Sequence, residues 1–363
     1  MSRAAIAILS TPNLIHNLSV IQSWAPNSGV LAMIKANAYG HGLRSTALRL
    51  SRHVRSLGVA SIDEALALRQ AGIKTSITLM EGAFEVDDLL LASCHGFEVV
   101  FHHHEQLLWL RHSSLPLPLK GWIKVDTGMG RLGFTQHEMP GAYEELSAST
   151  QIDQPIGIMS HFGCAEDKTH PLNAHQIKQF NEMTQTMPGL KSFSNSAAML
   201  NFPEANYDVV RSGLALYGVS PIPGKMAPDL GLKPVMTLQT RLIAIKKMLK
   251  GDSIGYGARY TCAEDMLVGI IAMGYGDGYP RSAQDGMPTL VAEQRCPLVG
   301  RVSMDMAVID LRKAPEAKVN DSVVLWGTGL PVEEIASYTS NSTYDILCGI
   351  QARVKFHWTM DLS

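Results

Sequence analysis

Residues 30–42 read VLAMIKANAYGHG, a short apolar run that ends at a lysine and continues into small and polar residues. Such a run is typical of a buried β-strand, so we expect Lys35 at the carboxyl end of a strand. Seven further runs of strand length follow: SLGVA (56–60), SITLM (76–80), FEVVF (97–101), GWIKVD (121–126), IGIMSHF (156–162), KSFSNS (191–196) and VVRSGLALYG (209–218). The segments between them are long enough for helices. The pattern therefore predicts an α/β fold, a parallel (β/α)8 barrel of the TIM type.

Two of the connecting segments carry clear helical patterns. IDEALALRQAG (62–72) ends with a stop signal for a helix, Gly72. PLNAHQIKQFNEMTQTM (171–187) begins with a proline. Proline is favoured in the first turn of a helix and glycine just beyond its end. Both segments are therefore predicted to be crossover helices of the barrel.

The composition of the sequence changes after Gly218. The stretch SPIPGKMAPDLGLKP (220–234) is rich in proline and glycine and predicts a linker near residues 219–234. In the runs beyond it, apolar and polar residues alternate, and turn residues separate one run from the next. This indicates a mainly β domain with one helix near EEIASYTS (333–340). We predict a barrel domain over residues 1–225 and a mainly β C-terminal domain over residues 226–363, with residues 1–10 packing on the second domain.

Composition and charge argue against several classes of function. The formal net charge is −2, without a basic stripe that could neutralise a phosphate backbone, so nucleic acid is not an expected partner. The five cysteines are widely spaced and include no C-x-x-C pair, which favours a reducing, cytoplasmic location. The N-terminal apolar run is interrupted at Pro12, so we expect neither a signal peptide nor a membrane partner.

Polar residues gather at the predicted carboxyl ends of the strands, where the active site of a (β/α)8 barrel lies. They are Lys35, Arg131, His161, Asn195, Ser196 and Arg211. The apolar run before Lys35 would partly remove its amino group from water, which suits a Schiff base with an aldehyde cofactor. Hydroxyl groups and glycines near the last two strands can hold a phosphate.

Three consecutive histidines, His102–His104, follow another strand. Adjacent residues at a strand end point to alternate faces and rarely bind one ion. We therefore predict a solvated turn here and no metal site.

Eight strings in order make the chain resemble alanine racemases: IKANAYGHG, KVDTGMGRLG, MSHFGCAED, SNSAA, VVRSGLALYG, IGYGARYT, GYGDGYPR and GRVSMDM. The resemblance implies a barrel that binds pyridoxal 5'-phosphate, followed by a β domain. It also implies a head-to-tail homodimer in which the second domain of one subunit completes the site of the other. The implied activity is the interconversion of L- and D-alanine, which supplies D-alanine for peptidoglycan or serves alanine catabolism.

The resemblance assigns the two acid/base groups. Lys35 would bind the cofactor and act as one of them, and Tyr256 would enter from the partner subunit as the other. Racemisation removes a proton from one face of the α-carbon and returns one to the opposite face, so two such groups are required. A tyrosine needs nearby positive charge to act as a base, and Arg259 is the candidate.

The remaining site residues follow from the matching motifs. The cofactor would contact Tyr39, His161, Asn195, Ser196, Arg211, Gly213, Leu214 and Tyr344. Among these, Arg211 would face the pyridine nitrogen and His161 would hydrogen-bond Arg211. The substrate carboxylate would bind Arg131 and the backbone N–H of Met304. Lys124 matches a position that is often carbamylated, where the added carboxylate steadies Arg131.

Two alternative functions remain open. A broad-specificity amino-acid racemase would use the same groups, because one methylene in a pocket changes binding by only ~1–3 kcal/mol. A pyridoxal-phosphate-dependent amino-acid decarboxylase would share Lys35 but would not need Tyr256.

Overall fold

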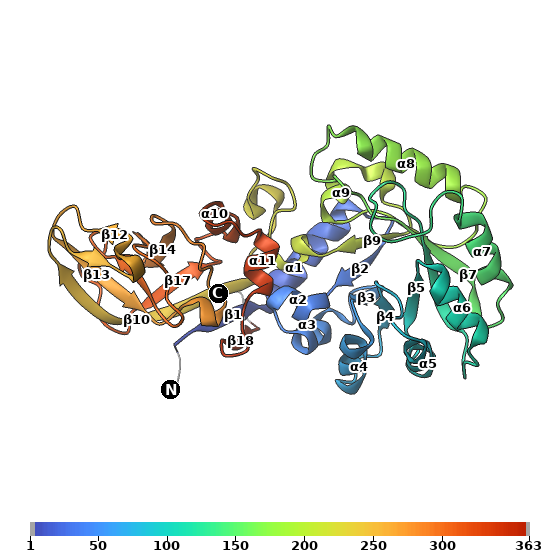
Figure 1. The fold of residues 1–363 in the computed structure, drawn as a ribbon, viewed down its shortest axis with the longest axis horizontal. Coiled ribbons are helices and arrows are strands. Elements are labelled where there is room, and N and C mark those ends of the chain that lie inside the picture. Colours follow the sequence, from blue (N-terminus) through green and yellow to red (C-terminus); the bar gives the residue numbers. More distant parts are fainter. Residues whose placement is uncertain (1–3, 361–363) are drawn as a thin grey trace.

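The computed structural model describes residues 4–360, which form a helix-covered barrel and a β domain beside it (Figure 1). The barrel strands are all parallel and lie in the order β8-β7-β6-β5-β4-β3-β2-β9. They are β2 (Gly29–Met33), β3 (Ser56–Val59), β4 (Ser76–Leu79), β5 (Glu98–Phe101), β6 (Leu119–Lys124), β7 (Ile152–Met159), β8 (Lys191–Ser192) and β9 (Val209–Ser212). The two end strands approach each other where the Arg211 backbone N–H donates to the Ser194 carbonyl at 2.9 Å. Each predicted run overlaps one of these strands, although β2, β6 and β7 begin before the predicted runs do. The predicted barrel is confirmed.

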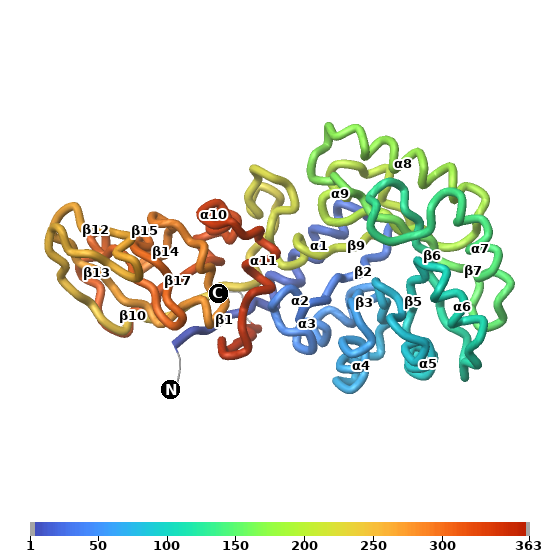
Figure 2. Tube along the Cα trace, in the orientation of Figure 1, coloured from blue at the N-terminus to red at the C-terminus, as the bar shows by residue number. Residues whose placement is uncertain are grey.

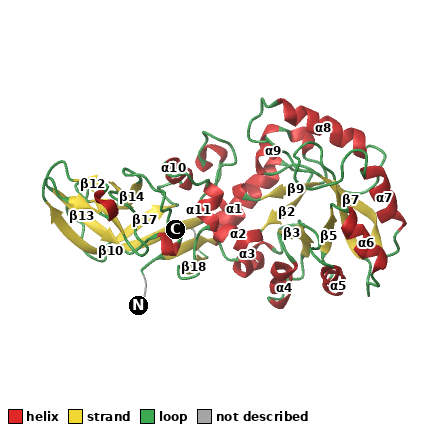
Figure 3. Ribbon diagram, viewed as in Figure 1, coloured by secondary structure: helices red, strands yellow, loops and turns green. Residues whose placement is uncertain are grey.

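Helices surround the barrel, as the colouring by secondary structure shows (Figure 3). They are α1 (Thr11–Trp24), α3 (Leu43–Leu50), α4 (Ile62–Gln70), α5 (Val86–His95), α6 (His104–His112), α7 (Met139–Ala148), α8 (Pro171–Thr184) and α9 (Ser196–Asn201). The predicted stop after α4 is confirmed, because Gly72 has a φ of 82°. The helix predicted to begin at Pro171 is confirmed as α8. Within residues 4–360, no helix is both long and apolar enough to cross a membrane.

The N-terminal segment belongs to both parts of the molecule. Strand β1 (Ile6–Ser10) pairs with β10 (Met236–Met248) and with β18 (Lys355–Thr359) in the second sheet, and α1 then continues into the barrel. Figure 2 shows the blue N-terminal chain running alongside the orange and red segments. Pro12 does not prevent α1 from forming, because a backbone N–H is not needed in the first turn.

The second part is built on a sheet in the order β15-β14-β17-β10-β1-β18, with β13 paired to β10 and to β16. Its other strands are β13 (Met266–Ile271), β14 (Pro288–Val291), β15 (Gln294–Pro297), β16 (Ala307–Asp310) and β17 (Ser322–Trp326), and a separate hairpin joins β11 (Ser253–Ile254) to β12 (Tyr260–Thr261). The helices α10 (Val332–Ser337) and α11 (Thr343–Cys348) lie on the side toward the barrel (Figure 1). The predicted mainly β architecture and its helix near residue 333 are confirmed.

Each part has its own apolar core, and one aromatic side chain connects them. Trp358 of β18 packs against both cores. The Arg49 guanidinium lies 4.2 Å from the centre of the Trp358 ring, a cation–π contact between the barrel and the second sheet. These contacts, together with β1, tie the two parts together.

Candidate active site

A cavity of about 1100 Å³ opens at the carboxyl ends of the barrel strands. Every residue that we predicted for the site lines it, except Tyr256 and Met304: Lys35, Tyr39, Lys124, Arg131, His161, Asn195, Ser196, Arg211, Gly213, Leu214 and Tyr344. Glu81, His102 and Cys348, which we did not predict for the site, line it as well. Parallel strands that end at one face bring together residues far apart in the sequence.

Lys35 lies just beyond β2 and forms an ion pair with Glu81, which lies just beyond β4. The distance from Lys35 Nζ to Glu81 Oε1 is 3.0 Å, and the two side chains are 36% and 34% exposed. The amine is therefore partly shielded from water and paired with a carboxylate. The sequence did offer a signal for Glu81, since it is a polar residue at the end of a predicted strand.

The residues after Lys35 form a left-handed turn, α2 (Lys35–Gly40), in which residues 36–39 have φ values between 51° and 55°. A left-handed helical conformation costs about 1–2 kcal/mol for each residue with a Cβ. Side chains hold the turn: Glu64 Oε1 accepts from the Ala36 backbone N–H at 2.8 Å, and Asn37 Oδ1 accepts from that of Leu43 at 2.9 Å. Such strain persists where surrounding contacts enforce it, most often at functional sites.

The left-handed turn places Tyr39 at the cavity wall. Its ring stacks on Tyr217 at 5.1 Å between ring centres, and Tyr217 stacks on His41 at 4.5 Å. A Cβ on Gly213 would lie 2.5 Å from the Tyr39 hydroxyl, so only glycine allows this approach. Burial, with a smaller contribution from Tyr344, raises the pKa of Tyr39. The hydroxyl therefore keeps its proton and can donate it in a hydrogen bond to an anion.

Arg211 of β9 is a fixed, buried cation, 4% exposed. Its guanidinium donates to Ser192 Oγ (2.7 Å), the Ser160 carbonyl (2.5 Å) and the Phe193 carbonyl (3.0 Å). It also lies 3.0 Å from His161 Nδ1, which must accept, because a guanidinium has only donors. Burial and the nearby Arg211 charge hold the pKa of His161 well below its ordinary value, so the ring is neutral with its proton on Nε2. Burial lowers the pKa of Arg211 to about 10, which leaves it charged at neutral pH.

Lys124 ends β6 and is 7% exposed. Burial and the nearby charges of Arg211, Arg131 and Lys35 lower the pKa of Lys124 to about 8. A lysine with such a pKa offers a neutral, nucleophilic amine near physiological pH.

Asn195 and Ser196 stand where β8 leads into α9. Asn195 Oδ1 caps α9 by accepting from the Ala197 and Ala198 backbone N–H groups at 3.1 and 3.0 Å. Ser196 Oγ accepts from the Gly213 backbone N–H at 3.2 Å. These bonds fix two polar side chains at the cavity wall beside the end of β9.

Comparison with known proteins identifies the family. The models of the alanine racemase N-terminal and C-terminal domains match residues 9–221 and 235–358. The chain belongs to the alanine racemase family. It is 45% identical to an alanine racemase of Coxiella burnetii (strain CbuG_Q212), over 98% of this chain and 99% of the relative. It is 43% identical to one of Legionella pneumophila (strain Lens), over 98% of this chain and 100% of the relative.

Solved structures of alanine racemases share the complete fold. The biosynthetic alanine racemase from Pseudomonas aeruginosa superposes with a TM-score of 0.95 at 36% identity, covering 98% of this chain and 99% of that one. The alanine racemase from Acinetobacter baumannii gives a TM-score of 0.91 at 36% identity, covering 98% of this chain and 100% of that one.

Two residues that the alanine racemase motifs assign to the site do not line the cavity of their own chain. Tyr256 lies in a short turn between β11 and β12 and is 69% exposed, and Met304 precedes β16 and is 53% exposed. Strand β12 lies at the end of the β domain away from the barrel (Figure 1). Arg259 pairs with Asp285 at 3.3 Å, so its charge already has a partner within the β domain.

The prediction of a solvated turn at residues 102–104 is wrong for His102. His102 lines the cavity, and its Nε2 lies 2.9 Å from the Glu81 carbonyl. His103 caps α6 by accepting from the Glu105 backbone N–H at 3.2 Å, and His104 begins the helix. Strand β5 ends at Phe101, which leaves His102 at the barrel mouth rather than in solvent.

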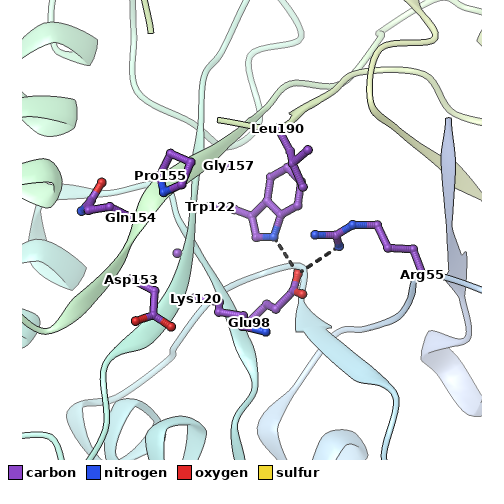
Figure 4. Close-up of a pocket in the computed structure, with 10 residues that line it drawn as sticks. Arg55, Glu98, Lys120, Trp122, Asp153, Gln154, Pro155, Gly157 and Leu190 are labelled. Carbon is purple, nitrogen blue, oxygen red and sulfur yellow. Dashed lines mark hydrogen bonds and ion pairs between the residues drawn. The ribbon is translucent and has the colours of Figure 1, made fainter. Parts of the chain in front are cut away.

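A smaller cavity of about 270 Å³ lies at the opposite end of the barrel (Figure 4). Glu98 is 2% exposed there and accepts from Trp122 Nε1 at 2.8 Å and Thr78 Oγ1 at 3.0 Å. Arg55 forms an ion pair with it at 3.5 Å, and Figure 4 shows the indole and the guanidinium both directed at the carboxylate. The amino-terminal face of a barrel serves stability, so we assign these residues a structural role.

Proposed function

We propose that this protein is an alanine racemase that interconverts L- and D-alanine with bound pyridoxal 5'-phosphate. The observation that carries the proposal is a primary amine, Lys35, in a large cavity whose wall also holds Lys124, Arg131 and Arg211. A surplus of positive charge in a cavity suits an anionic ligand. The chain's membership of the alanine racemase family supports the same conclusion.

The cavity's donor groups fit this cofactor, which has an aldehyde, a phosphate, a phenolic oxygen and a ring nitrogen. The amine of Lys35 would hold the aldehyde carbon. We assign the other contacts to Tyr39, His161, Asn195, Ser196, Arg211, Gly213, Leu214 and Tyr344. When bound, the cofactor withdraws electrons from the α-carbon of the amino acid and so acidifies its C–H bond.

Arg211 would face the ring nitrogen as a hydrogen-bond donor. Its guanidinium is fixed by its acceptors and by His161, so it points in one direction. Because a guanidinium keeps its proton, Arg211 would hydrogen-bond the ring nitrogen without protonating it. The residue thereby limits how strongly the ring withdraws electrons.

Two groups would move the proton. Lys35 Nζ would take or return it on one face of the α-carbon, and Tyr256 Oη of a second subunit on the other. Arg131 and the Met304 backbone N–H would bind the substrate carboxylate, with Met304 also from the second subunit. The exposure of Tyr256 and Met304, away from their own cavity, supports this head-to-tail homodimer.

In this proposal residues 1–225 provide most of the cofactor contacts. Residues 226–363 add Tyr344 to the site of their own chain and Tyr256 and Met304 to that of the other subunit. The reaction would take place in the cytoplasm and supply D-alanine for peptidoglycan or serve alanine catabolism. The name of the Pseudomonas aeruginosa relative, a biosynthetic alanine racemase, supports the first of these roles.

Lys124 is the proposed site of a carbamate. Its neutral amine would attack carbon dioxide, forming an N–C bond and releasing a proton. The new carboxylate would then steady Arg131. The lowered pKa of Lys124 supports this reaction.

The test is to incubate the protein and the cofactor with L-alanine and to follow both enantiomers and carbon dioxide. Enantiomers have equal free energy in water, so a racemase must reach an equal mixture from either side. Tyr256→Phe should lose activity, whereas Tyr260→Phe, on the same hairpin, should retain it. Release of carbon dioxide would indicate a decarboxylase. Equally fast turnover of serine would indicate a broad-specificity racemase. No turnover of any amino acid would overturn the proposal.

A further inference from the structure

Glu81 makes the ion pair with Lys35 but has no part in the function proposed above. We propose that Glu81 is a positioning residue that holds the Lys35 amine and sets the pH at which this amine is free to react. The inference rests on the proposed function, because it assigns to the acid/base lysine a partner within its own chain.

The backbone of the loop that carries Glu81 is fixed. Gly82 has a φ of 71°, and a Cβ there would lie 2.3 Å from the Val100 carbonyl oxygen, so the loop lies tightly against β5. The buried side chain of Gln106 donates to the Ala83 carbonyl at 3.0 Å. His102 Nε2 lies 2.9 Å from the Glu81 carbonyl. The carboxylate therefore extends from a rigid support at the barrel mouth.

The other titratable groups that act on Lys35 come from three elements. They are Lys124 at the end of β6, His161 just beyond β7 and Cys348 at the end of α11. His161 is held neutral, and burial raises the pKa of the Cys348 thiol, so that it stays protonated near neutral pH. The charges of Arg131 and Arg211, together with that of Lys124 while its amine is protonated and not carbamylated, disfavour a further ammonium group nearby.

Glu81 opposes these cations. A carboxylate 3.0 Å from an amine favours the ammonium form, and the same carboxylate also acts to raise the pKa of Lys124. An acid/base lysine must carry its proton in one half of the reaction and lack it in the other. Glu81 therefore controls proton transfer on the Lys35 face of the substrate, while Tyr256 serves the opposite face without such a partner from this loop.

The first experiment measures Lys35 directly in the full-length protein without added substrate or cofactor. Reductive methylation between pH 6 and pH 11, read by mass spectrometry of the peptide that contains Lys35, gives the pH midpoint of amine reactivity. Glu81→Gln should lower this midpoint by about half a pH unit to one pH unit, because the ammonium form loses its partner. Glu85→Gln removes the same charge from an exposed position in the same loop and should leave the midpoint unchanged.

Glu81→Asp distinguishes the effect of the charge from that of the direct contact. It keeps the carboxylate, but its side chain is one methylene shorter, so the carboxylate lies farther from the Lys35 amine. Its midpoint should fall between those of the wild-type protein and Glu81→Gln. The melting temperature should change little in all three variants, because a partly exposed ion pair contributes little stability. An unchanged midpoint in Glu81→Gln, or an equal shift in Glu85→Gln, would overturn the proposal.

The second experiment uses the protein with cofactor and alanine deuterated at the α-carbon. Glu81→Gln should increase the primary isotope effect in the direction in which Lys35 takes the proton and leave it unchanged in the other. Equal changes in both directions would indicate a merely structural role and contradict the proposal. The methylation experiment does not require racemisation, so loss of the proposed function and failure of this inference give different results.

Discussion

The two ends of the barrel handle buried charge in opposite ways. At the amino-terminal end, Glu98 is surrounded by an ion pair and two hydrogen bonds, beside a cavity of about 270 Å³. At the carboxyl end, Lys124 and Arg211 are buried beside Arg131 and Lys35, and the cavity measures about 1100 Å³. Charges that are satisfied within the chain serve the fold, whereas a surplus of one sign prepares a cavity for a ligand of the other.

The largest effect should come from removing the amine at the carboxyl end. Lys35→Ala should reduce the rate of alanine racemisation by about 10⁴-fold or more, because it removes both the cofactor attachment and one acid/base group. Lys35→Arg keeps the positive charge but not the nucleophile and should be similarly impaired. Substantial activity in either variant, measured by chiral separation of alanine, would contradict the assignment of Lys35.

The next largest effect should come from replacing Tyr256, which we propose acts in the site of a second subunit. Tyr256→Phe should lower the racemisation rate by about 10²–10⁴-fold, the usual contribution of a general acid/base group. Mixing equal amounts of Lys35→Ala and Tyr256→Phe subunits tests the shared site. Random pairing places one intact site in half of the dimers, so activity should recover to about a quarter of the wild-type value. No recovery after verified subunit exchange would count against a site shared between subunits.

Two lysines on one strand allow the carboxyl and amino-terminal ends of the barrel to be compared by mutation. Lys124 and Lys120 stand at opposite ends of β6. Lys124→Ala should lower kcat/KM about tenfold, the effect of losing one charge-assisted hydrogen bond to Arg131, and Lys120→Ala should leave it unchanged. Because the pKa of Lys124 is lowered to about 8, the neutral amine increases as the pH rises through 8.

Carbamate formation at Lys124 should follow the same pH dependence. It should appear as a new carbonyl signal in carbon-13 NMR with labelled bicarbonate at pH 8 and be absent in Lys124→Ala. A signal of equal strength in that variant would assign the carbamate elsewhere.

The smallest effect on activity should come from the amino-terminal end. Glu98→Gln should destabilise the fold by about 2–4 kcal/mol, because a buried carboxylate loses its charge beside Arg55 and part of its hydrogen bonding. The value of kcat/KM should stay close to that of the wild-type protein. Thermal unfolding and racemisation assays, with the exposed Asp153→Asn as control, would measure both. A large loss of activity without loss of stability would mean that this end also takes part in function.

The barrel could be predicted because its information is local. Each strand is a short apolar run, and each polar residue at a strand end reaches the same face by the topology of parallel strands. We predicted that residues 1–10 pack on the second domain, but β1 pairs with β10 and β18 across more than two hundred positions, and no local pattern predicts these strand partners or their register. The same holds for the Lys35–Glu81 ion pair and for His102, whose role depends on where β5 ends.

The sequence by itself determined the eight barrel strands, the mainly β second part and the motifs that place the chain among the alanine racemases. Only the tertiary structure decided that residues 36–39 form a left-handed turn, because its strain is supported by Glu64 and by other contacts distant in sequence. It likewise decided that Arg259 pairs with Asp285. Strand and helix patterns arise from neighbouring residues, whereas charge pairing and strain depend on which distant segments the fold brings into contact.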